Sequence, residues 1–323
     1  MKGIVLEEAG PRFKDAAVPE PGQGQALIRV RNAALNRADV VMASGQSHGR
    51  AGGPGTVLGL EWAGVIEKLG AGCSGLAVGD RVMCSGLGGF AEFAVADASR
   101  LMTIPDALDF ETAATLPVAL QTMHNAVITA GAMKKGEAVL VQGASSGVGL
   151  MAMQIAKLMG AGLVIGTSTN DARRARLTEF GADLAIDTRQ ADWPAQVKEA
   201  TGGRGVDVII DQVSGDLVNQ NISAAAILGR IVNVGRLGGR SASFDCEMHA
   251  LKRISYVGVT FRTRTADEVR EINRLMKADL WPAVEDGRLR LPVDHRFPLS
   301  EGVAALERMR QNQHFGKIVL AMA

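Results

Sequence analysis

The pattern of apolar residues changes character about one third of the way along the chain. From residue 1 to about residue 109, short β-type runs are separated by glycine and proline, which is typical of a small all-β barrel. These runs lie at 3–6, 26–30, 62–69, 81–84 and 90–95, with one helical stretch at 37–44. The first third is therefore expected to form a domain of short strands.

From about residue 113, strand and helix patterns alternate. The run 136–142 is continuously apolar, as in strands that are buried on both faces of a parallel sheet. Five further strands are expected at 163–166, 184–186, 206–211, 230–234 and 254–259, and helices at 147–159, 171–180, 193–200 and 217–228. Six strands with short helical crossovers predict an α/β fold with a doubly wound parallel sheet. The tail from about residue 262 is mixed, ends in a strand at 317–320, and is large enough to complete the first domain.

Composition and charge narrow the function classes. Lys plus Arg (35) nearly balances Asp plus Glu (34), which argues against a nucleic-acid binder. Three cysteines without a CxxC motif indicate a reduced compartment. Acidic residues near the N-terminus argue against a signal peptide, and no apolar run reaches the ~18 residues of a membrane helix. We therefore expect a cytoplasmic protein without membrane or nucleic-acid partners.

A loop of small residues joins the first parallel strand to its helix. It comprises Gly143, Ala144, Ser145, Ser146, Gly147, Val148 and Gly149. The strict GxGxxG motif is absent, because Ala144 and Ser146 stand at two of its three glycine positions. Such a turn lets backbone N–H groups and the helix N-terminus approach a pyrophosphate. The alternative is an ordinary strand-to-helix turn, but the complete strand–turn–helix unit favours a dinucleotide site.

The end of the second parallel strand indicates which dinucleotide is bound. Ser168 stands where NAD enzymes carry an acidic residue, and Arg173 opens the next helix. A guanidinium can hold a phosphate with two hydrogen bonds, so NADPH is the expected cofactor. In the alternative interpretation Arg173 and Arg174 form a solvated helix face, and Asp171 weakens the case for phosphate.

Motifs spread over the whole chain carry a family resemblance. They are Ala34-Leu35-Asn36-Arg37-Ala38-Asp39, Leu58-Gly59-Leu60-Glu61-Trp62-Ala63-Gly64, Val78-Gly79-Asp80-Arg81-Val82, Gly89-Phe90-Ala91-Glu92, the 143–149 loop, Phe180-Gly181-Ala182-Asp183 and Gly316-Lys317-Ile318-Val319-Leu320. The chain resembles the medium-chain dehydrogenase/reductase superfamily, in its zinc-free, zeta-crystallin-like NADPH:quinone oxidoreductase branch. The resemblance implies a GroES-like β-barrel catalytic domain (1–120 with 262–323), a Rossmann NADPH-binding domain (121–261) and a cleft between them.

The resemblance also bears on zinc and on further cofactor contacts. In zinc-dependent relatives a His ligand precedes a Glu, but here Leu60 precedes Glu61 and cannot ligate. The first cysteine ligand and the four-cysteine lobe are missing too, so no metal is expected. The family match adds cofactor contacts at Thr122, Gly235, Phe261, Arg262, Gly316 and Lys317. Taken singly, each of these could equally be an ordinary turn or core position.

The substrate side departs from the family. Ala43 and Ser47 replace an Arg and a Tyr of its motif, and Asp187-Thr188 replaces an Asn-Tyr that contacts the adenine side. The glycine-rich stretch 44–55 could be a mobile lid. Asn36 and Arg37 are candidate catalytic donors to a substrate oxygen, with Asp39 as their orienting group. In the alternative, Arg37 and Asp39 form a structural ion pair.

No side chain stands out as a proton donor. Tyr256 falls inside an apolar strand, which indicates a core position, while His48 lies in the glycine-rich stretch and His124 near the expected cofactor. A quinone accepts hydride with little assistance, and its oxyanion can take a proton from water. The missing acid therefore fits a quinone better than a less reactive acceptor.

The leading hypothesis is hydride transfer from NADPH to quinones. The first alternative is NADPH-dependent reduction of activated C=C bonds of the enone, enal or 2-haloacrylate type, because the pocket sets the substrate. The second is a non-enzymatic, crystallin-like NADPH-binding protein. The apolar strand 254–259 should lie at the sheet edge, where it could pair with a second copy, so a homodimer is expected.

Overall fold

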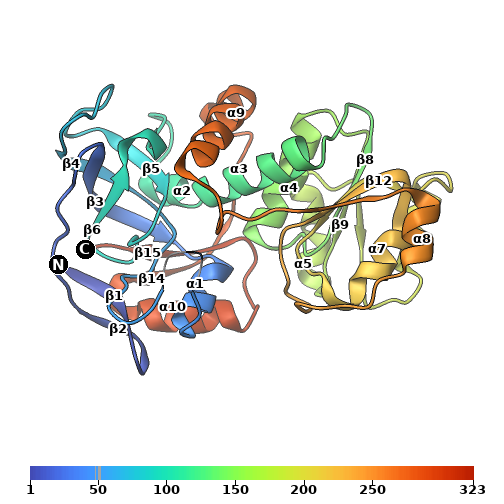
Figure 1. The fold of residues 1–323 in the computed structure, drawn as a ribbon, viewed down its shortest axis with the longest axis horizontal. Helices are drawn as coiled ribbons and strands as arrows, with labels where there is room; N and C mark the ends of the chain where they lie inside the picture. The colour runs from blue at the N-terminus through green and yellow to red at the C-terminus, as the bar shows by residue number, and fades with distance from the viewer. Residues whose placement is uncertain (48, 50–51) are drawn as a thin grey trace. The chain divides into compact units, whose positions relative to one another are not determined.

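The chain folds into two units, each built around its own sheet (Figure 1). The computed structural model describes residues 1–47, 49 and 52–323. The first unit joins both ends of the chain, Met1–Val118 and Phe261–Ala323, and the second unit is Ala119–Thr260.

The first unit contains a seven-stranded sheet. Its order is β14-β15-β3-β4-β5-β7, with β6 paired to β3. The strands are β3 (Gln25–Ala34), β4 (Glu61–Leu69), β5 (Arg81–Ser85), β6 (Phe93–Asp97), β7 (Met102–Thr103), β14 (Val293–Pro298) and β15 (Lys317–Ala321); β1 (Lys2–Glu7) and β2 (Gly10–Asp15) form a separate hairpin. The expected GroES-like architecture is confirmed. Antiparallel pairing of β15 with β3 carries the C-terminal segment into the core of the N-terminal strands.

Helices of the first unit surround this sheet. They are α1 (Arg37–Ala43), α2 (Phe110–Ala114), α9 (Ala266–Glu285) and α10 (Gly302–Arg310). The core between them is formed by residues such as Trp62, Phe90 and Leu306. The long helix α9 begins at a capping box between Thr265 and Glu268, a signal that the sequence interpretation left within its mixed tail.

The second unit is a six-stranded parallel sheet of order β10-β9-β8-β11-β12-β13. Its strands are β8 (Ala138–Val141), β9 (Leu163–Thr167), β10 (Leu184–Ile186), β11 (Val206–Asp211), β12 (Ala225–Asn233) and β13 (Ser255–Gly258). In chain order this is 3-2-1-4-5-6, the Rossmann arrangement. The prediction of a six-stranded doubly wound sheet is confirmed, and β13 lies at its edge.

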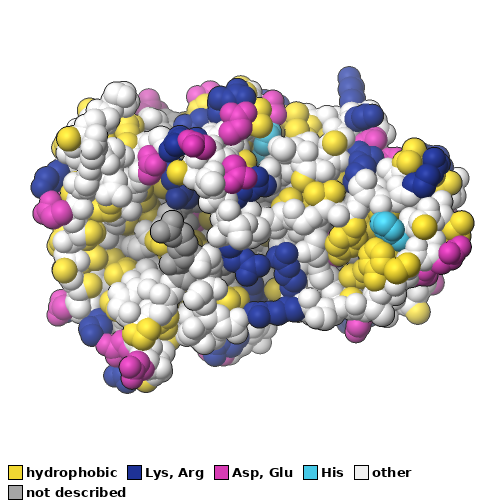
Figure 2. Space-filling model, in the orientation of Figure 1, with side chains coloured by type: hydrophobic (Ala, Val, Ile, Leu, Met, Phe, Trp, Pro, Cys, Tyr) yellow, Lys and Arg dark blue, Asp and Glu magenta, His cyan; other side chains and the backbone are white. Residues whose placement is uncertain are grey.

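The helices of the second unit are mostly short. They are α3 (Pro117–His124), a π-helical continuation (Asn125–Ala130), α4 (Gly147–Leu158), α5 (Asp171–Ala175), α6 (Trp193–Ala200), α7 (Val218–Ala224) and α8 (Cys246–Lys252). Hydrophobic side chains gather on the surface over α7 and α8 (Figure 2), where Leu251 is 63% exposed. None of the helices in the described part of the chain is long and apolar enough to cross a membrane.

Two helix predictions in this unit were wrong in extent. The helix expected at 171–180 stops at Ala175 and continues as a 3₁₀ turn (Leu177–Phe180), which Gly181 ends in the left-handed region (φ +96°). The helix expected at 217–228 ends at Ala224, because the next residues pair with β11. Buried pairing with a neighbouring strand there outweighs the helix propensity of an Ala-Ala-Ile-Leu sequence.

Candidate functional site

The small-residue loop lies at the carboxyl end of β8 and leads directly into α4. Ser146 caps the helix, accepting a hydrogen bond from Gly149 N (3.1 Å). Gly143 has φ +66°, and a Cβ at Gly149 would lie 2.7 Å from both Gly143 O and Ala144 Cα. The loop therefore packs against the helix so closely that only glycine fits at 149. The first-turn N–H groups of α4 have no helical acceptor and are suited to bind an anion.

A network of buried hydrogen bonds holds the 143–149 loop in position. Thr167 Oγ1, at the end of β9, accepts from Gly143 N (3.1 Å) and donates to Gln142 Oε1 (2.8 Å). Gln142 Nε2 in turn donates to Asn221 Oδ1 (2.8 Å). On the other side, Ser146 Oγ lies 3.0 Å from Gln212 Oε1. Hydrogen bonds thus connect the loop to the strands on both sides of β8.

Asp211 anchors the far end of that network. Its Oδ1 accepts from Val213 N and Ser214 N (both 2.8 Å), and its Oδ2 accepts from Asn221 Nδ2 (3.1 Å). Burial raises the pKa of Asp211, and these donors partly offset that effect. Sequence reasoning predicted Gly143 and Ser146 but missed the other members of the network, which are Gln142, Thr167, Asp211, Gln212 and Asn221. The available signal was the polar residues that end otherwise apolar strands, at 142, 167 and 211.

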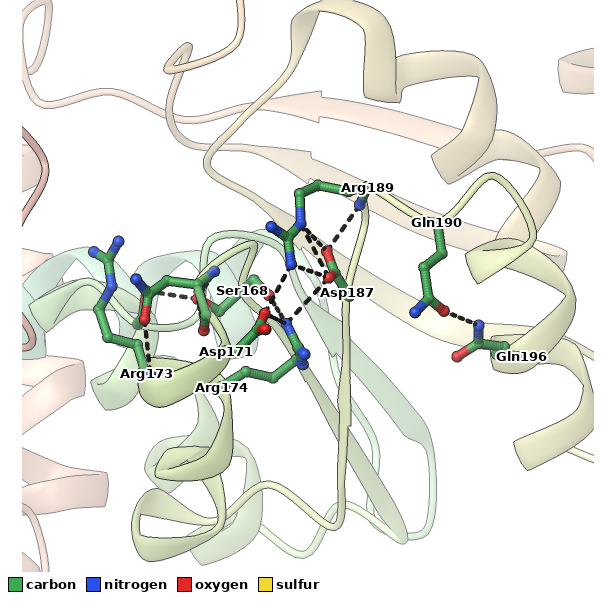
Figure 3. A network of polar contacts seen from close by, with 10 residues as sticks. Ser168, Asp171, Arg173, Arg174, Asp187, Arg189, Gln190 and Gln196 are labelled. Carbon is green, nitrogen blue, oxygen red and sulfur yellow. Dashed lines mark hydrogen bonds and ion pairs between the residues drawn. The ribbon is translucent and has the colours of Figure 1, made fainter.

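Ser168 and Arg173 lie beside the next strand end (Figure 3). Ser168 is buried directly after β9, and its Oγ lies 3.3 Å from both Ser145 Oγ and Asn170 N. Asn170 caps α5 by accepting from Arg173 N (3.0 Å). In Figure 3 the Arg173 side chain points away from Asp187, whereas Arg174 points toward it. The structure therefore brings the loop and the β9 end together, and separates the two arginines that the sequence makes neighbours.

A second arginine, Arg189, binds Asp187, and sequence reasoning missed it. Arg189 Nε lies 3.0 Å from both carboxylate oxygens of Asp187, and Arg189 Nη2 lies 2.5 Å from Oδ2. These hydrogen bonds from Arg189 lower the pKa of Asp187 to about 2. Asp187, in the place of the family's Asn, is thus an ionised carboxylate at neutral pH.

In the first unit, Asn36, Asp39 and Lys317 meet around Glu61. Lys317 Nζ forms a buried ion pair with Glu61 Oε1 and lies 3.0 Å from Asn36 Oδ1, while Asn36 Nδ2 donates to Glu61 Oε1 (2.9 Å). The second oxygen of Glu61 accepts from Val118 N (2.9 Å). Of the four residues, Glu61 alone was not predicted as a site residue.

Asp39 is the second buried carboxyl of this cluster. It closes a capping box on α1, accepting from Asn36 N (2.7 Å), and its Oδ1 has no hydrogen-bond partner within the described structure. Burial raises the pKa of Asp39 to about 8, with a smaller contribution from the nearby Glu61 carboxylate and opposition from Lys317. The Lys317 ammonium pairs with Glu61 and not with Asp39, so burial favours the neutral form of Asp39.

Arg37 does not pair with Asp39, which corrects one sequence-based alternative. Its Nη2 donates instead to Asn312 Oδ1, from the segment after α10. The reason is the capping of α1: the Asp39 carboxyl turns back onto Asn36 N at the start of the helix. Asp39 therefore orients the backbone of Asn36 but not Arg37.

The remaining predicted residues lie in scattered places. Thr122 is half-buried in α3, while Phe261 and Arg262 follow β13 in the first unit. Gly235 follows β12 and could not carry a Cβ, which would lie 2.4 Å from Gln212 O. Gly316 (φ +84°) is packed in the same way against Pro292 O.

The departures from the family motif are placed as follows. Ala43 is buried in α1, and Ser47 is exposed. Tyr256 is half-buried, not core, and its hydroxyl lies 3.4 Å from Asn233 Nδ2. His124 is the last residue of α3. His48, and with it part of the expected lid at 44–55, lies outside the described residues.

Metal ligands do not gather in the part of the chain that the structure describes: no group of three His, Cys, Asp or Glu side chains there could hold a metal ion. Leu60 packs against the hydrophobic core of the first unit.

Known families match both units. A family model described as an alcohol dehydrogenase GroES-like domain matches residues 22–106, and one described as a zinc-binding dehydrogenase matches 147–278. Quinone oxidoreductase of Rattus norvegicus is 30% identical over 325 residues, covering 98% of this chain and 96% of the relative. The chain belongs to the medium-chain dehydrogenase/reductase superfamily. It is an oxidoreductase, as its full-length relatives are, and this argues against the non-enzymatic alternative.

Other proteins that are similar to this chain have names that indicate different activities and cofactors. A polyketide synthase subunit of Mycobacterium tuberculosis is 31% identical over 94% of this chain, which spans 14% of that protein. A mycobacterial structure complexed with NADPH (27% identical, 99% of each chain, TM-score 0.89) and the CurK enoyl reductase (26%, 100% and 99%, TM-score 0.87) share the fold. So does an NAD-dependent alcohol dehydrogenase (29%, 100% of each chain, TM-score 0.87).

Proposed function

We propose that this oxidoreductase transfers hydride from NADPH to a quinone, without zinc. The cofactor assignment rests on the small-residue loop 143–149 at the start of α4 and on the neighbouring end of β9. There Ser168 stands in place of an acidic residue, and arginines lie next to it. The mycobacterial relative complexed with NADPH supports the same choice. The NAD-dependent alcohol dehydrogenase structure represents the competing one.

The described residues fit a dinucleotide with a 2′-phosphate. A Cβ at Gly149 would collide with the backbone of Gly143 and Ala144, so glycine there lets the loop pack closely onto the N-terminus of α4. The first turn of α4 would donate N–H groups to that pyrophosphate, and Ser146 and Thr167 hold the loop in position. Arg173 would neutralise the 2′-phosphate. Thr122, Gly235, Phe261, Arg262, Gly316 and Lys317 remain predicted contacts from the family pattern.

Bound NADPH supplies the hydride, and the chain supplies binding, orientation and exclusion of water. The Asn36 amide is already held by Lys317 and Glu61, so it can present only a fixed orientation. Arg37 is the remaining cationic donor of that segment for an oxygen that gains charge. A quinone needs little further help, because its reduced oxygen can take a proton from water.

The absence of zinc from the proposal rests on the residues at the ligand positions. Leu60 packs into the core where zinc-dependent relatives have a His, and Asn36 stands in the segment where they have a Cys. The cation beside Asn36 is the ammonium of Lys317. Metal analysis of the purified, active protein should therefore find no stoichiometric zinc, and chelators should leave turnover unchanged; loss of activity on chelation would contradict this.

A second candidate function is reduction of activated C=C bonds. The CurK enoyl reductase and the polyketide synthase relative favour it, and so do Ala43 and Ser47 at altered positions of the substrate-side motif. Here the carbonyl or carboxylate of the substrate would need a donor such as Arg37.

The deciding experiment is anaerobic oxidation of NADPH and NADH with ortho- and para-quinones, enones and 2-haloacrylate. Fast turnover of quinones alone supports the leading proposal, and fast turnover of enones or haloacrylate with slow quinone reduction supports the second. Arg173→Ala should raise KM for NADPH about tenfold or more and leave NADH unchanged. Arg176→Ala is the matched control, because Arg176 pairs with Glu179 on the exposed following turn.

We further propose a homodimer formed through the edge strand β13. Exposed apolar side chains of the adjacent segment, Phe244, Met248 and Leu251, flank this edge and would be covered in it. Sedimentation equilibrium should give twice the 33.9 kDa of one chain at micromolar concentration. A particle of the single-chain mass would contradict the dimer.

A further inference from the structure

Four charged side chains form one connected group at the ends of β9 and β10 (Figure 3). Asp187 is bound by Arg189 as described above and also lies 3.2 Å from Arg174 Nη1. Asp171 Oδ1 closes the group, with Arg174 Nη1 at 3.1 Å and Arg189 Nη2 at 2.7 Å. Each guanidinium is therefore held by two carboxylates, which restricts its rotation far more than one exposed pair would.

The group lies directly against Ser168. Arg174 Nη1 donates to Ser168 O (3.1 Å), and Ser168 N donates to Ile186 O (3.1 Å), the residue before Asp187. Ser168 is the residue whose position in Rossmann folds faces the ribose 2′ substituent. The two guanidinium groups thus stand beside the place where a 2′-phosphate would be bound.

Arg174 and Arg189 both have N–H groups that take no part in these hydrogen bonds. Arg189 uses Nε and Nη2, and Arg174 uses Nη1; their other N–H groups have no partner among the residues described. Arg189 is 57% exposed, so its remaining donors face solvent. If Arg189 served only to neutralise Asp187, a second arginine on the same carboxylate, Arg174, would be unnecessary.

We propose that Arg189 and Arg174, positioned by Asp187, complete the 2′-phosphate site of NADPH on the side opposite Arg173. This inference rests on the NADPH assignment above and adds to it two phosphate-binding residues and one positioning residue. The four-residue group is itself neutral, and together with Arg173 the proposed site carries a net charge of +1, which a phosphate of about −1.5 to −2 complements. A 2′-hydroxyl offers no such charge, so the group favours NADPH over NADH.

Calorimetric titration with two nucleotides tests the proposal without turnover. Adenosine 2′,5′-bisphosphate and adenosine 5′-monophosphate differ only in the 2′-phosphate. Arg189→Met should weaken binding of the bisphosphate about tenfold and leave the monophosphate within about twofold, because it removes a charge-assisted contact. Arg174→Met should act in the same direction, and Arg176→Met, on the following turn, should change neither affinity.

Asp187→Asn separates positioning from direct contact. It removes a negative charge, so a purely electrostatic effect would strengthen bisphosphate binding, whereas loss of positioning weakens it. We expect weakening, with Arg189→Lys recovering less than half of the loss in binding free energy caused by Arg189→Met, because a lysine lacks the guanidinium fork.

The outcomes distinguish the two proposals. If the wild type binds both nucleotides equally, the NADPH assignment fails and this inference fails with it. If the wild type prefers the bisphosphate and Arg173→Ala removes that preference while Arg189→Met does not, the NADPH assignment stands and this inference is wrong. Thermal melting of each variant establishes that the fold is intact.

Discussion

Lys317 and Glu61 form an ion pair inside the first unit, with 3% and 0% of their side chains exposed. Lys317 begins the last strand, β15, and Glu61 begins β4, so residues from the two ends of the chain are joined in one core. Removing one partner leaves the other as an uncompensated buried charge, which costs more than the pair itself contributes.

Lys317→Met should lower the free energy of unfolding by about 3–5 kcal/mol, and Glu61→Gln should also destabilise. The double variant should be more stable than either single variant, because neither buried charge then remains. Urea unfolding followed by circular dichroism measures all three. Additive losses in the double variant would show that the two side chains act independently.

Asp39 makes stability depend on pH. Its pKa is about 8 in the folded chain, against an ordinary value of about 3.9 in the unfolded chain. Between these values the folded state keeps a proton that the unfolded state has lost, so the free energy of unfolding falls as pH rises. The Asp39 contribution to this slope reaches at most about 1.4 kcal/mol per pH unit and ends above pH 8.

Asp39→Asn should flatten this dependence between pH 5 and 8, because the amide stays neutral and can still accept from Asn36 N. The readout is the urea midpoint at each pH. The exposed Asp106→Asn serves as the control and should keep the wild-type slope. An unchanged slope in Asp39→Asn would mean that Asp39 is ionised in the folded protein.

The sequence predicted the parallel sheet well because each of its strands is a short apolar run bounded by turn residues. Runs such as 206–211 have no helical periodicity that competes with the strand pattern. The prediction failed where pattern and pairing disagree: Ala225 and Ala226 suit a helix, yet their burial against β11 makes them strand. Local patterns contain no information about such a neighbour.

The candidate site was predicted only in its local parts. The 143–149 loop can be recognised from consecutive residues, as can Ser168 and Arg173. Glu61 and Lys317 are 256 residues apart, and only the fold shows that they meet. Arg189 was missed for another reason: its partner Asp187 is only two residues away, but the sequence does not show that this segment lies beside Ser168, at the end of the neighbouring strand β9.

A Gly149 variant tests how closely the 143–149 loop must pack against α4. A Cβ there would lie 2.7 Å from backbone atoms of Gly143 and Ala144, which cannot move without opening the loop. Gly149→Ala should therefore weaken NADPH binding more than tenfold and lower the melting temperature. Gly86→Ala is the control, because its Cβ would meet Cys84 Sγ at 3.5 Å and the Trp62 ring at 3.9 Å, both ordinary contact distances. Tight NADPH binding by Gly149→Ala would refute the close packing.

A Thr167 variant tests whether the buried hydrogen-bond network is needed to hold the 143–149 loop in the conformation that binds the cofactor. Thr167→Val keeps the shape but removes the hydroxyl that joins Gly143 N to Gln142 Oε1. Both groups then lose a buried hydrogen bond, at a cost of about 1–3 kcal/mol. The loop should become less ordered, so NADPH affinity should fall together with stability, whereas Thr178→Val, at an exposed position, should change neither. A stable Thr167→Val protein with wild-type NADPH affinity would show that the loop keeps its conformation without the network below it.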